Sequence, residues 1–137
     1  MGAQVKLSER LAFRGNVDPK SYTAGSTTNS EAVDMEIYNQ VCFRIELGVH
    51  GTTVFKLQES NDGGANWSDI SGKSLTITSN NVQRFIDCRA DELSEGYYLV
   101  RSNMYLSSAS GLAASNATAG DPRYAAPSHE SSVSDSA

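Results

Sequence analysis

The sequence predicts an all-β protein, an antiparallel β-sandwich of the jelly-roll or immunoglobulin-like type. Residues 41–49 alternate apolar and polar side chains without interruption, which is the pattern of a half-buried strand. Residues 55–70, FKLQESNDGGANWSDI, contain a second alternating stretch, a cluster of turn-forming residues and a return to apolar positions. This order is typical of a β-hairpin with Trp67 at its base. No segment supports a helix longer than about two turns by its 3.6-residue periodicity.

The bulk composition indicates one globular domain in this chain of 137 residues, of which 39% are hydrophobic and 20% are charged. The net charge of -5 argues against nucleic acid as a partner, because phosphate binding needs a basic patch. The sequence has neither an apolar secretory segment nor the run of about 18 apolar residues that could span a bilayer. We therefore expect no membrane partner and synthesis in the cytoplasm.

The N-terminal half is expected to contain an arm, a loop and three strands. Residues 1–16 are assigned as an N-terminal arm, within which residues 12–14 either stay irregular or form a short edge strand. The polar run that continues to Ser30 contains Pro19 and Gly25 and is predicted to be a long loop. The three strands, the last two joined by a tight turn at His50-Gly51, are predicted at residues 33–38, 41–49 and 52–59.

The C-terminal half is expected to contain short strands and a tail. Residues 89–96 are predicted to form an acidic turn, with space for one helical turn ended by Gly96. Residues 120–137 are rich in Ser and Ala and cannot bury enough apolar area to fold alone, so they form either a tail or an arm on a neighbouring subunit. The sandwich domain is thus expected to span residues 17–119. Beyond a turn at residues 71–73, strands are predicted at residues 74–78, 82–88, 97–106 and 112–118.

The two cysteines, Cys42 and Cys88, lie inside predicted strands. A disulfide between them across the sandwich is one option, but a chain without a secretory segment favours reduced thiols. Two cysteines together with only His50 and His129 lack the spacing of a zinc site, so no metal is predicted. No other cofactor is expected, because the glycine pair 63–64 lacks the lysine and the helix of a phosphate-binding loop.

The sharpest local motif is residues 60–67, SNDGGANW, which fits S-x-D-x-G-x-x-W, the Asp-box pattern of sialidases and related propellers. In this motif the Asp carboxylate caps loop amides and the Trp packs under the turn. Because it occurs once in a chain too short for a propeller, we interpret it as a structural turn, with a carbohydrate contact through Trp67 as the alternative. No serine, histidine or carboxylate pair forms a catalytic motif, and we predict no catalytic residues and no enzyme.

Four segments together carry a resemblance to a known group of proteins. They are residues 55–73, residues 86–93 (IDCRADEL), residues 97–101 (YYLVR) and residues 121–127 (DPRYAAP). In this order they resemble the small head-associated structural proteins of tailed bacteriophages, which decorate or cement the capsid lattice. The Ser-rich extension after Pro127 departs from that pattern.

The resemblance implies a non-enzymatic virion structural protein on the capsid exterior that bridges neighbouring capsid subunits. Its partner would be the major capsid protein, and the symmetric shell favours a homo-oligomer, either a trimer or a dimer. Apolar groups in polar arms have little to do unless they dock on a partner. Removal of residues 1–14 is therefore expected to leave the fold intact and to weaken capsid attachment. The predicted partner-binding residues are Val5, Leu7, Leu11, Phe13, Arg123 and Tyr124.

Two other functions stay open at this point. In a carbohydrate-binding β-sandwich module, Trp67, Tyr97, Tyr98 and Tyr105 would form a stacking platform, although strand aromatics more often pack in a core. A head–tail connector or tail component of the virion would share the same sandwich.

Overall fold

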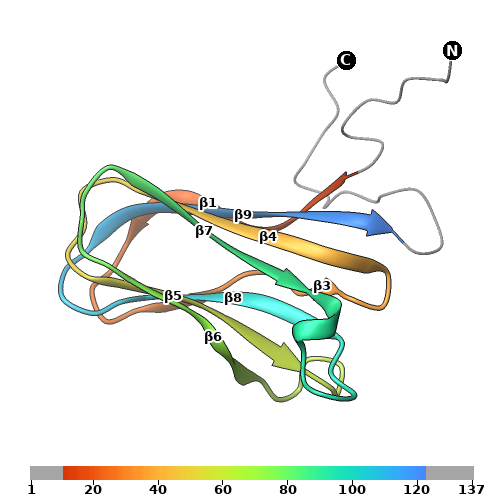
Figure 1. The fold of residues 1–137 in the computed structure, drawn as a ribbon. Coiled ribbons are helices and arrows are strands. Elements are labelled where there is room, and N and C mark those ends of the chain that lie inside the picture. The colour runs from red at the N-terminus through yellow and green to blue at the C-terminus, as the bar shows by residue number, and fades with distance from the viewer. Residues whose placement is uncertain (1–10, 123–137) are drawn as a thin grey trace, which may run out of the picture.

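The computed structural model describes residues 11–122 and consists of two antiparallel sheets packed face to face (Figure 1). One sheet has the strand order β1-β9-β4-β7, and the other has the order β2-β8-β5-β6 with β3 also paired to β8. The predicted all-β sandwich is confirmed. Its elements are β1 (Leu11–Tyr22), β2 (Thr27–Asn29), β3 (Val33–Asp34), β4 (Tyr38–Leu47), β5 (Thr53–Ser60), β6 (Ser68–Ile77), β7 (Val82–Arg89), the 3-10 turn η1 (Ala90–Glu92), β8 (Leu99–Leu106) and β9 (Gly111–Pro122).

The strand pairing identifies the sandwich as a jelly roll. The first strand pairs with the last, β2 and β3 pair with β8, β4 pairs with β7, and β5 pairs with β6. The chain thus forms one long antiparallel hairpin, which is rolled up by the further pairing of β4 with β9 and of β5 with β8. This arrangement is the jelly roll, and it decides between the two sandwich types that the sequence left open.

Alternating side chains place the core between the two sheets. In β4, the residues Val41, Phe43, Ile45 and Leu47 are each at most 4% exposed, while the residues between them point outward. Phe55 of β5 faces them from the other sheet and is fully buried. Each large apolar side chain buried in this way contributes about 1.5–3 kcal/mol to folding. The predicted hairpin of residues 55–70 is confirmed as the β5–β6 pair.

The first strand is where the sequence-based prediction of an arm and a loop was wrong. β1 runs from Leu11 to Tyr22 and pairs with β9, so it crosses the predicted boundary at residue 16 and occupies the first part of the predicted loop. The pairing shifts register on both sides of Val17. Gly15, with a φ of +68°, lies in the first irregularity and takes the left-handed conformation that β-bulges use. The bulges interrupt the period-two alternation of apolar and polar residues, so the sequence pattern did not predict this strand.

Smaller differences follow from local turns. The predicted strand at residues 33–38 is only Val33–Asp34, because residues 35–37 form a turn. The predicted turn at residues 71–73 is instead an irregularity inside the continuous strand β6, where Gly72 has a φ of +78°. The predicted helical turn within residues 89–96 is present as η1.

A buried histidine joins two connections between the sheets. His50 is 7% exposed, and its ring Nε2 lies 2.6 Å from the Ser79 carbonyl oxygen. Because a carbonyl only accepts, Nε2 carries the proton, and Nδ1 accepts from the Thr53 hydroxyl at 2.9 Å. The backbone N–H of His50 also donates to the Asn80 side chain. The connection between β4 and β5 is therefore fixed to the turn between β6 and β7.

Replacement of Gly15 by Ala should destabilise the fold more than the same change at Gly25. Both residues have a positive φ, which costs about 1–2 kcal/mol for a residue with a Cβ. At Gly15 the new Cβ would also lie 2.9 Å from the Ala117 Cβ, whereas nothing lies within 4 Å at Gly25. Overpacking adds about 1–3 kcal/mol. Denaturant unfolding of the two variants measures the difference, and equal losses would contradict the close packing of β1 on β9.

Candidate docking face

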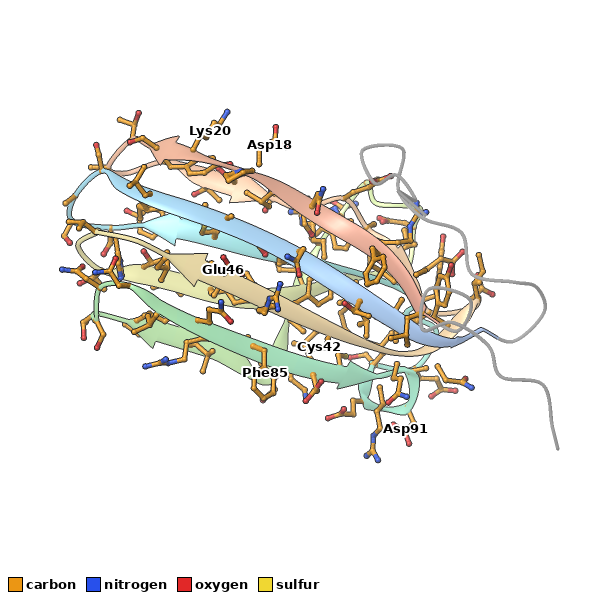
Figure 2. All side chains as sticks on the ribbon, turned by 90° about the horizontal axis from the view of Figure 1, so that it is seen from above. Asp18, Lys20, Cys42, Glu46, Phe85 and Asp91 are labelled. Carbon is orange, nitrogen blue, oxygen red and sulfur yellow. The ribbon has the colours of Figure 1, made fainter. Side chains whose placement is uncertain are left out.

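The outer face of the sheet β1-β9-β4-β7, which we call the β9 face, is built around a strand of small residues. On β9 the outward positions are held by Ala114, Asn116, Thr118 and Gly120, and the inward positions are equally small. Larger outward side chains from the neighbouring strands flank them. Figure 2 looks onto this face and shows Cys42 and Glu46 on β4 and Phe85 projecting from β7. The difference in side-chain size leaves β9 at the bottom of a trough.

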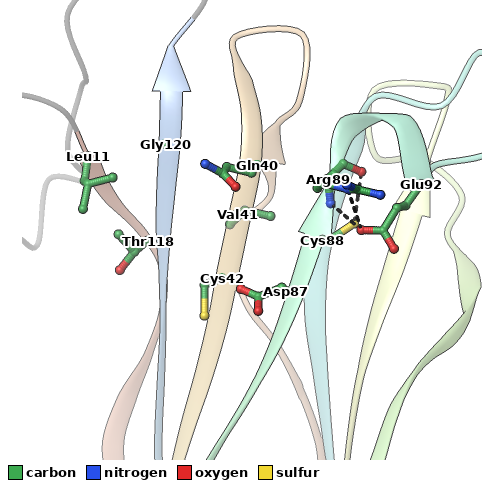
Figure 3. A pocket seen from close by; sticks show the side chains of 10 residues that line it. All are labelled: Leu11, Gln40, Val41, Cys42, Asp87, Cys88, Arg89, Glu92, Thr118 and Gly120. Atoms are coloured by element: carbon green, nitrogen blue, oxygen red, sulfur yellow. Dashed lines mark hydrogen bonds and ion pairs between the residues drawn. The ribbon is translucent and has the colours of Figure 1, made fainter.

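Two adjoining hollows of about 470 Å³ each lie in this trough. The terminal hollow lies near the ends of β1 and β9 and is drawn in Figure 3; its residues are Leu11, Gln40, Val41, Cys42, Asp87, Cys88, Arg89, Glu92, Thr118 and Gly120. The central hollow is lined by Phe13, Asn16, Cys42, Arg44, Asn116 and Thr118. Cys42 and Thr118 belong to both, and they are direct partners in the β4–β9 register. The hollows are thus neighbours along β9.

Glycine forms one end of the terminal hollow. Gly120 faces Leu11 across the β1–β9 pair, and a Cβ at this position would lie 3.1 Å from the Leu11 side chain. The Leu11 side chain therefore lies over β9 at this end. The hollow therefore lies at the end of the sheet where β1 begins and β9 ends.

The β9 face also exposes large apolar groups. Phe85 is 63% exposed and pairs with Arg44 across the β4–β7 register. Leu112 is 54% exposed at the other end of β9, where it lines a third hollow of about 420 Å³ with Lys20 and Glu46. Exposed aromatic and aliphatic groups around a concave surface are typical of an interaction site.

The outer face of the other sheet is covered by a polar network. Asp69 on β6 accepts hydrogen bonds from Lys56 and Gln58 of β5, each at 3.0 Å. Gln58 in turn accepts from the Arg101 Nε at 3.0 Å. The Arg101 guanidinium lies 4.3 Å from the centre of the Trp67 ring, a cation–π distance. These side chains bond to one another. The β9 face also carries an ion pair, between Arg44 and Glu46 at 3.5 Å, and it differs in the exposed side chains of Phe85 and Leu112.

The Asp-box turn between β5 and β6 is structural, as the sequence predicted. The Asp62 carboxylate accepts from the Asn66 backbone N–H at 3.0 Å and from the Ser60 hydroxyl at 2.8 Å. The Trp67 indole donates to the Gly64 carbonyl at 3.0 Å and so closes the turn. These bonds to Asn66 and Ser60 stabilise the charged carboxylate and lower the pKa of Asp62 from 3.8 to about 2.

The structure brings together only part of the residue set predicted for partner binding. Leu11 and Phe13 belong to β1 and line the terminal and the central hollow respectively. Val5, Leu7, Arg123 and Tyr124 lie outside the described residues. The residues predicted from the sequence do not include Cys42, Thr118, Arg44 or Phe85. The uninterrupted run of small residues from 113 to 120 was the signal that could have indicated the trough.

The aromatic platform proposed for carbohydrate is not assembled as one surface. One face of Trp67 is covered by Arg101, and the Tyr98 hydroxyl lies at the Gly63 turn. Tyr105 lies four residues beyond Arg101 on β8, which is about 13 Å along an extended strand. Arg101 itself has a lowered pKa because it is partly buried.

The two cysteines face opposite sides of their sheet. Cys88 pairs with Val41 and points into the core, whereas Cys42 pairs with Asp87 and points outward. A disulfide between them, left open by the sequence, is therefore excluded by the register, and both are free thiols. Burial, together with a hydrogen bond to the Asp87 carboxylate, raises the pKa of Cys42 to about 11. Burial and the nearby Glu92 raise the pKa of Cys88 to about 11.

Within residues 11–122, no group of three or more His, Cys, Asp or Glu side chains is arranged to hold a metal ion. Over the same residues, no helix has the length and apolar character needed to cross a membrane.

Comparisons with known proteins give distant likenesses in fold. No protein-family model and no curated protein matches the sequence. Among solved structures, the chain is similar to a subunit of the disulfide-linked pili of Bacillus endospore appendages, with 8% identity, a TM-score of 0.48, and coverage of 89% of this chain and 99% of that one. It is similar to a family 11 carbohydrate-binding module of Clostridium thermocellum, with 12% identity, a TM-score of 0.42, and coverage of 81% and 97%. It is also similar to the coat protein of tobacco streak virus, with 13% identity, a TM-score of 0.35, and coverage of 96% and 100%.

The Asp62 carboxylate should make the hairpin turn sensitive to acid. Because its pKa in the folded protein lies below its ordinary value of 3.8, its stabilising effect is complete above that value and is lost as pH falls from about 4 to 2. The Asp62 Cγ resonance in NMR should titrate near pH 2, and Trp67 fluorescence should report loosening of the turn over this range. Asp62→Asn should remove this transition. A midpoint near 3.8 would show that the bonds to Asn66 and Ser60 are absent.

The two thiols should differ in their accessibility to solvent, and both should react slowly with alkylating reagents. A thiol with a pKa near 11 is scarcely ionised at pH 8, so maleimide should label native Cys42 roughly a hundredfold more slowly than an ordinary exposed cysteine. Cys88 should react only after denaturation, because it is fully buried. Mass spectrometry counts the labels, and Cys42→Ser assigns the first one. Recovery of a Cys42–Cys88 disulfide from native protein would contradict the register of β4 and β7.

Proposed function

We propose that this chain is a non-enzymatic structural protein of a tailed-bacteriophage virion that decorates the capsid exterior and bridges neighbouring capsid subunits. The observation that best supports this is the position of the chain ends. Leu11 faces Gly120 across the β1–β9 pair, so the described part of the chain begins and ends at the same end of the sandwich, beside the terminal hollow. Chain ends at one end of a concave face suit a protein that attaches to its neighbours through its terminal segments.

The chemistry of the two faces supports the same proposal. A protein fixed to a lattice needs one surface for attachment and another that stays in solvent. The β9 face has exposed apolar groups and hollows, whereas the side chains of Lys56, Gln58 and Asp69 satisfy one another on the opposite face. Many copies with modest contact areas can together stabilise a shell, because their contributions add over the lattice. In this proposal the β9 face and the terminal segments meet the major capsid protein and neighbouring copies.

The alternatives have less support. For a carbohydrate-binding module, the Arg101 guanidinium would have to leave the Trp67 ring before a sugar could stack on that side. A head–tail connector or tail component would use the same sandwich and the same terminal segments, and the number of copies in the particle distinguishes it.

Quantitative mass spectrometry of purified virions tests the proposal. Hundreds of copies in a fixed ratio to the major capsid protein are expected for a decoration protein. A handful of copies would assign the chain to the tail or connector, and its absence from particles would refute a virion role.

Deletion of residues 1–10 is the matching test of attachment. The deletion ends at residue 10 because residues 11–14 are part of β1, so the removal of residues 1–14 considered from the sequence would also damage the sheet. The truncated chain should keep its circular dichroism spectrum and bind at least tenfold more weakly to particles that lack it. Unchanged binding would mean that the N-terminal segment does not attach the protein.

A further inference from the structure

The two hollows of the β9 face have a spacing that fits an extended segment. The terminal and central hollows share Cys42 and Thr118 and extend from them toward opposite ends of β9, to Gly120 and to Asn116. Each step from residue 116 to 118 to 120 advances about 7 Å, the distance between side chains on one side of a strand. The hollows are thus about one such step apart. A partner with apolar side chains at positions i and i+2 would fill both.

The N-terminal segment of this chain has that pattern. Residues 1–10 read MGAQVKLSER, in which Val5 and Leu7 are the alternating apolar residues. In an extended conformation both side chains point to one side and that of Lys6 points to the other. The side chains of residues 1–10 carry one net positive charge, whereas the whole chain carries -5. Residues 123–137 lack a comparable apolar pair at this spacing and carry one net negative charge.

The geometry points to a second copy as the one that supplies the segment. The segment joins β1 at Leu11, which lines the terminal hollow, and β1 runs from there along the trough, so the segment would have to reverse direction at once to enter the trough of its own copy. Residues 5–11 contain no Gly, Pro, Asn or Asp, and Ser8, whose hydroxyl supports turns more weakly, is the one turn-forming residue among them. An extended continuation instead carries Val5 about 20 Å beyond Leu11, within reach of a neighbour.

We propose that copies of this chain exchange their N-terminal segments, with Val5 and Leu7 of one copy filling the terminal and central hollows on the β9 face of the next. Val5 and Leu7 would then pack beside the apolar side chains of Leu11 and Phe13, which line the terminal and the central hollow respectively. Exchange within a closed ring or a two-fold dimer uses every segment and every hollow. This inference concerns contacts between copies and does not depend on the capsid role.

Cys42 provides a reporter of the contact, because it lines both hollows. A chain with Leu7→Cys and Cys42→Ser, mixed with the unchanged chain, can form a disulfide between residues 7 and 42 only across two copies. Under copper–phenanthroline at pH 9 we expect a covalent dimer on non-reducing gels, and mass spectrometry of its linked peptides should give the 7–42 disulfide and not a 7–7 disulfide between variant chains. Val5→Cys should give the corresponding 5–42 disulfide. Lys6→Cys is the matched control, since its side chain points away, and it should give at least tenfold less dimer.

The other outcomes overturn the proposal. An intrachain link in Leu7→Cys with Cys42 retained, without a link in the mixture, would mean that the segment folds back on its own copy. No link in either experiment, or equal links from positions 5, 6 and 7, would mean that the segment does not lie in the hollows. The thiol of Cys88 is buried and does not compete in the folded protein.

Association of the full chain gives a second, independent measurement. Sedimentation velocity should show an oligomer that the double change Val5→Asp and Leu7→Asp weakens at least tenfold. Val133→Asp, an apolar-to-acid change in the C-terminal segment, should leave the oligomer unchanged. Thr118→Trp, which fills the wall shared by both hollows, should weaken association while the circular dichroism spectrum stays that of a β-sandwich. A chain that is monomeric at all concentrations, or an oligomer indifferent to residues 5, 7 and 118, would refute segment exchange.

Discussion

The small size of the side chains on β9 is the constraint on which most of this structure depends. β9 lies between β1 and β4 and pairs with both along its length. On its inner side, Ala117 and Ala119 are at most 1% exposed and leave room for larger residues such as Phe43. Because residue 117 is an alanine and residue 15 a glycine, the bulge of β1 can approach β9 and Phe43 closely. A larger residue at an inward position of β9 would push the two sheets apart.

The same property creates the trough on the outer side. A strand with small groups on both faces cannot fill the space between the outward side chains of its neighbours, Phe13 on β1 and Cys42 and Arg44 on β4. The core packing and the candidate docking face are thus two consequences of one stretch of sequence. A larger side chain should therefore be tolerated at an outward position of β9, where it fills the trough, and not at an inward position, where it would disrupt the core.

Polar side chains have two further roles in this structure: they fix the connections between strands, and they cover exposed surfaces. His50 fixes the β4–β5 connection to the β6–β7 turn, and Asp62 closes the β5–β6 loop. Lys73 on β6 donates to the Asp87 carbonyl at 2.8 Å and pairs with Glu92, so it bridges the edges of the two sheets at β6 and β7. An edge covered in this way is a poor template for another strand. This edge is therefore a less suitable docking site than the β9 face.

The sequence by itself determined the all-β class, the strand pattern of β4 and β5, and the Asp-box turn. In each case the information is local: period-two alternation reports burial on one face, and the turn is closed by residues within its own eight positions. Tertiary structure alone decided the jelly-roll pairing, the bulged strand β1, the opposite orientations of Cys42 and Cys88, and the trough. These depend on which strands lie side by side, which is a long-range property. The hollows in particular exist only because β9 lies between β1, about 100 residues away along the chain, and β4, about 75 residues away, and no local pattern reports what a strand's neighbours will be.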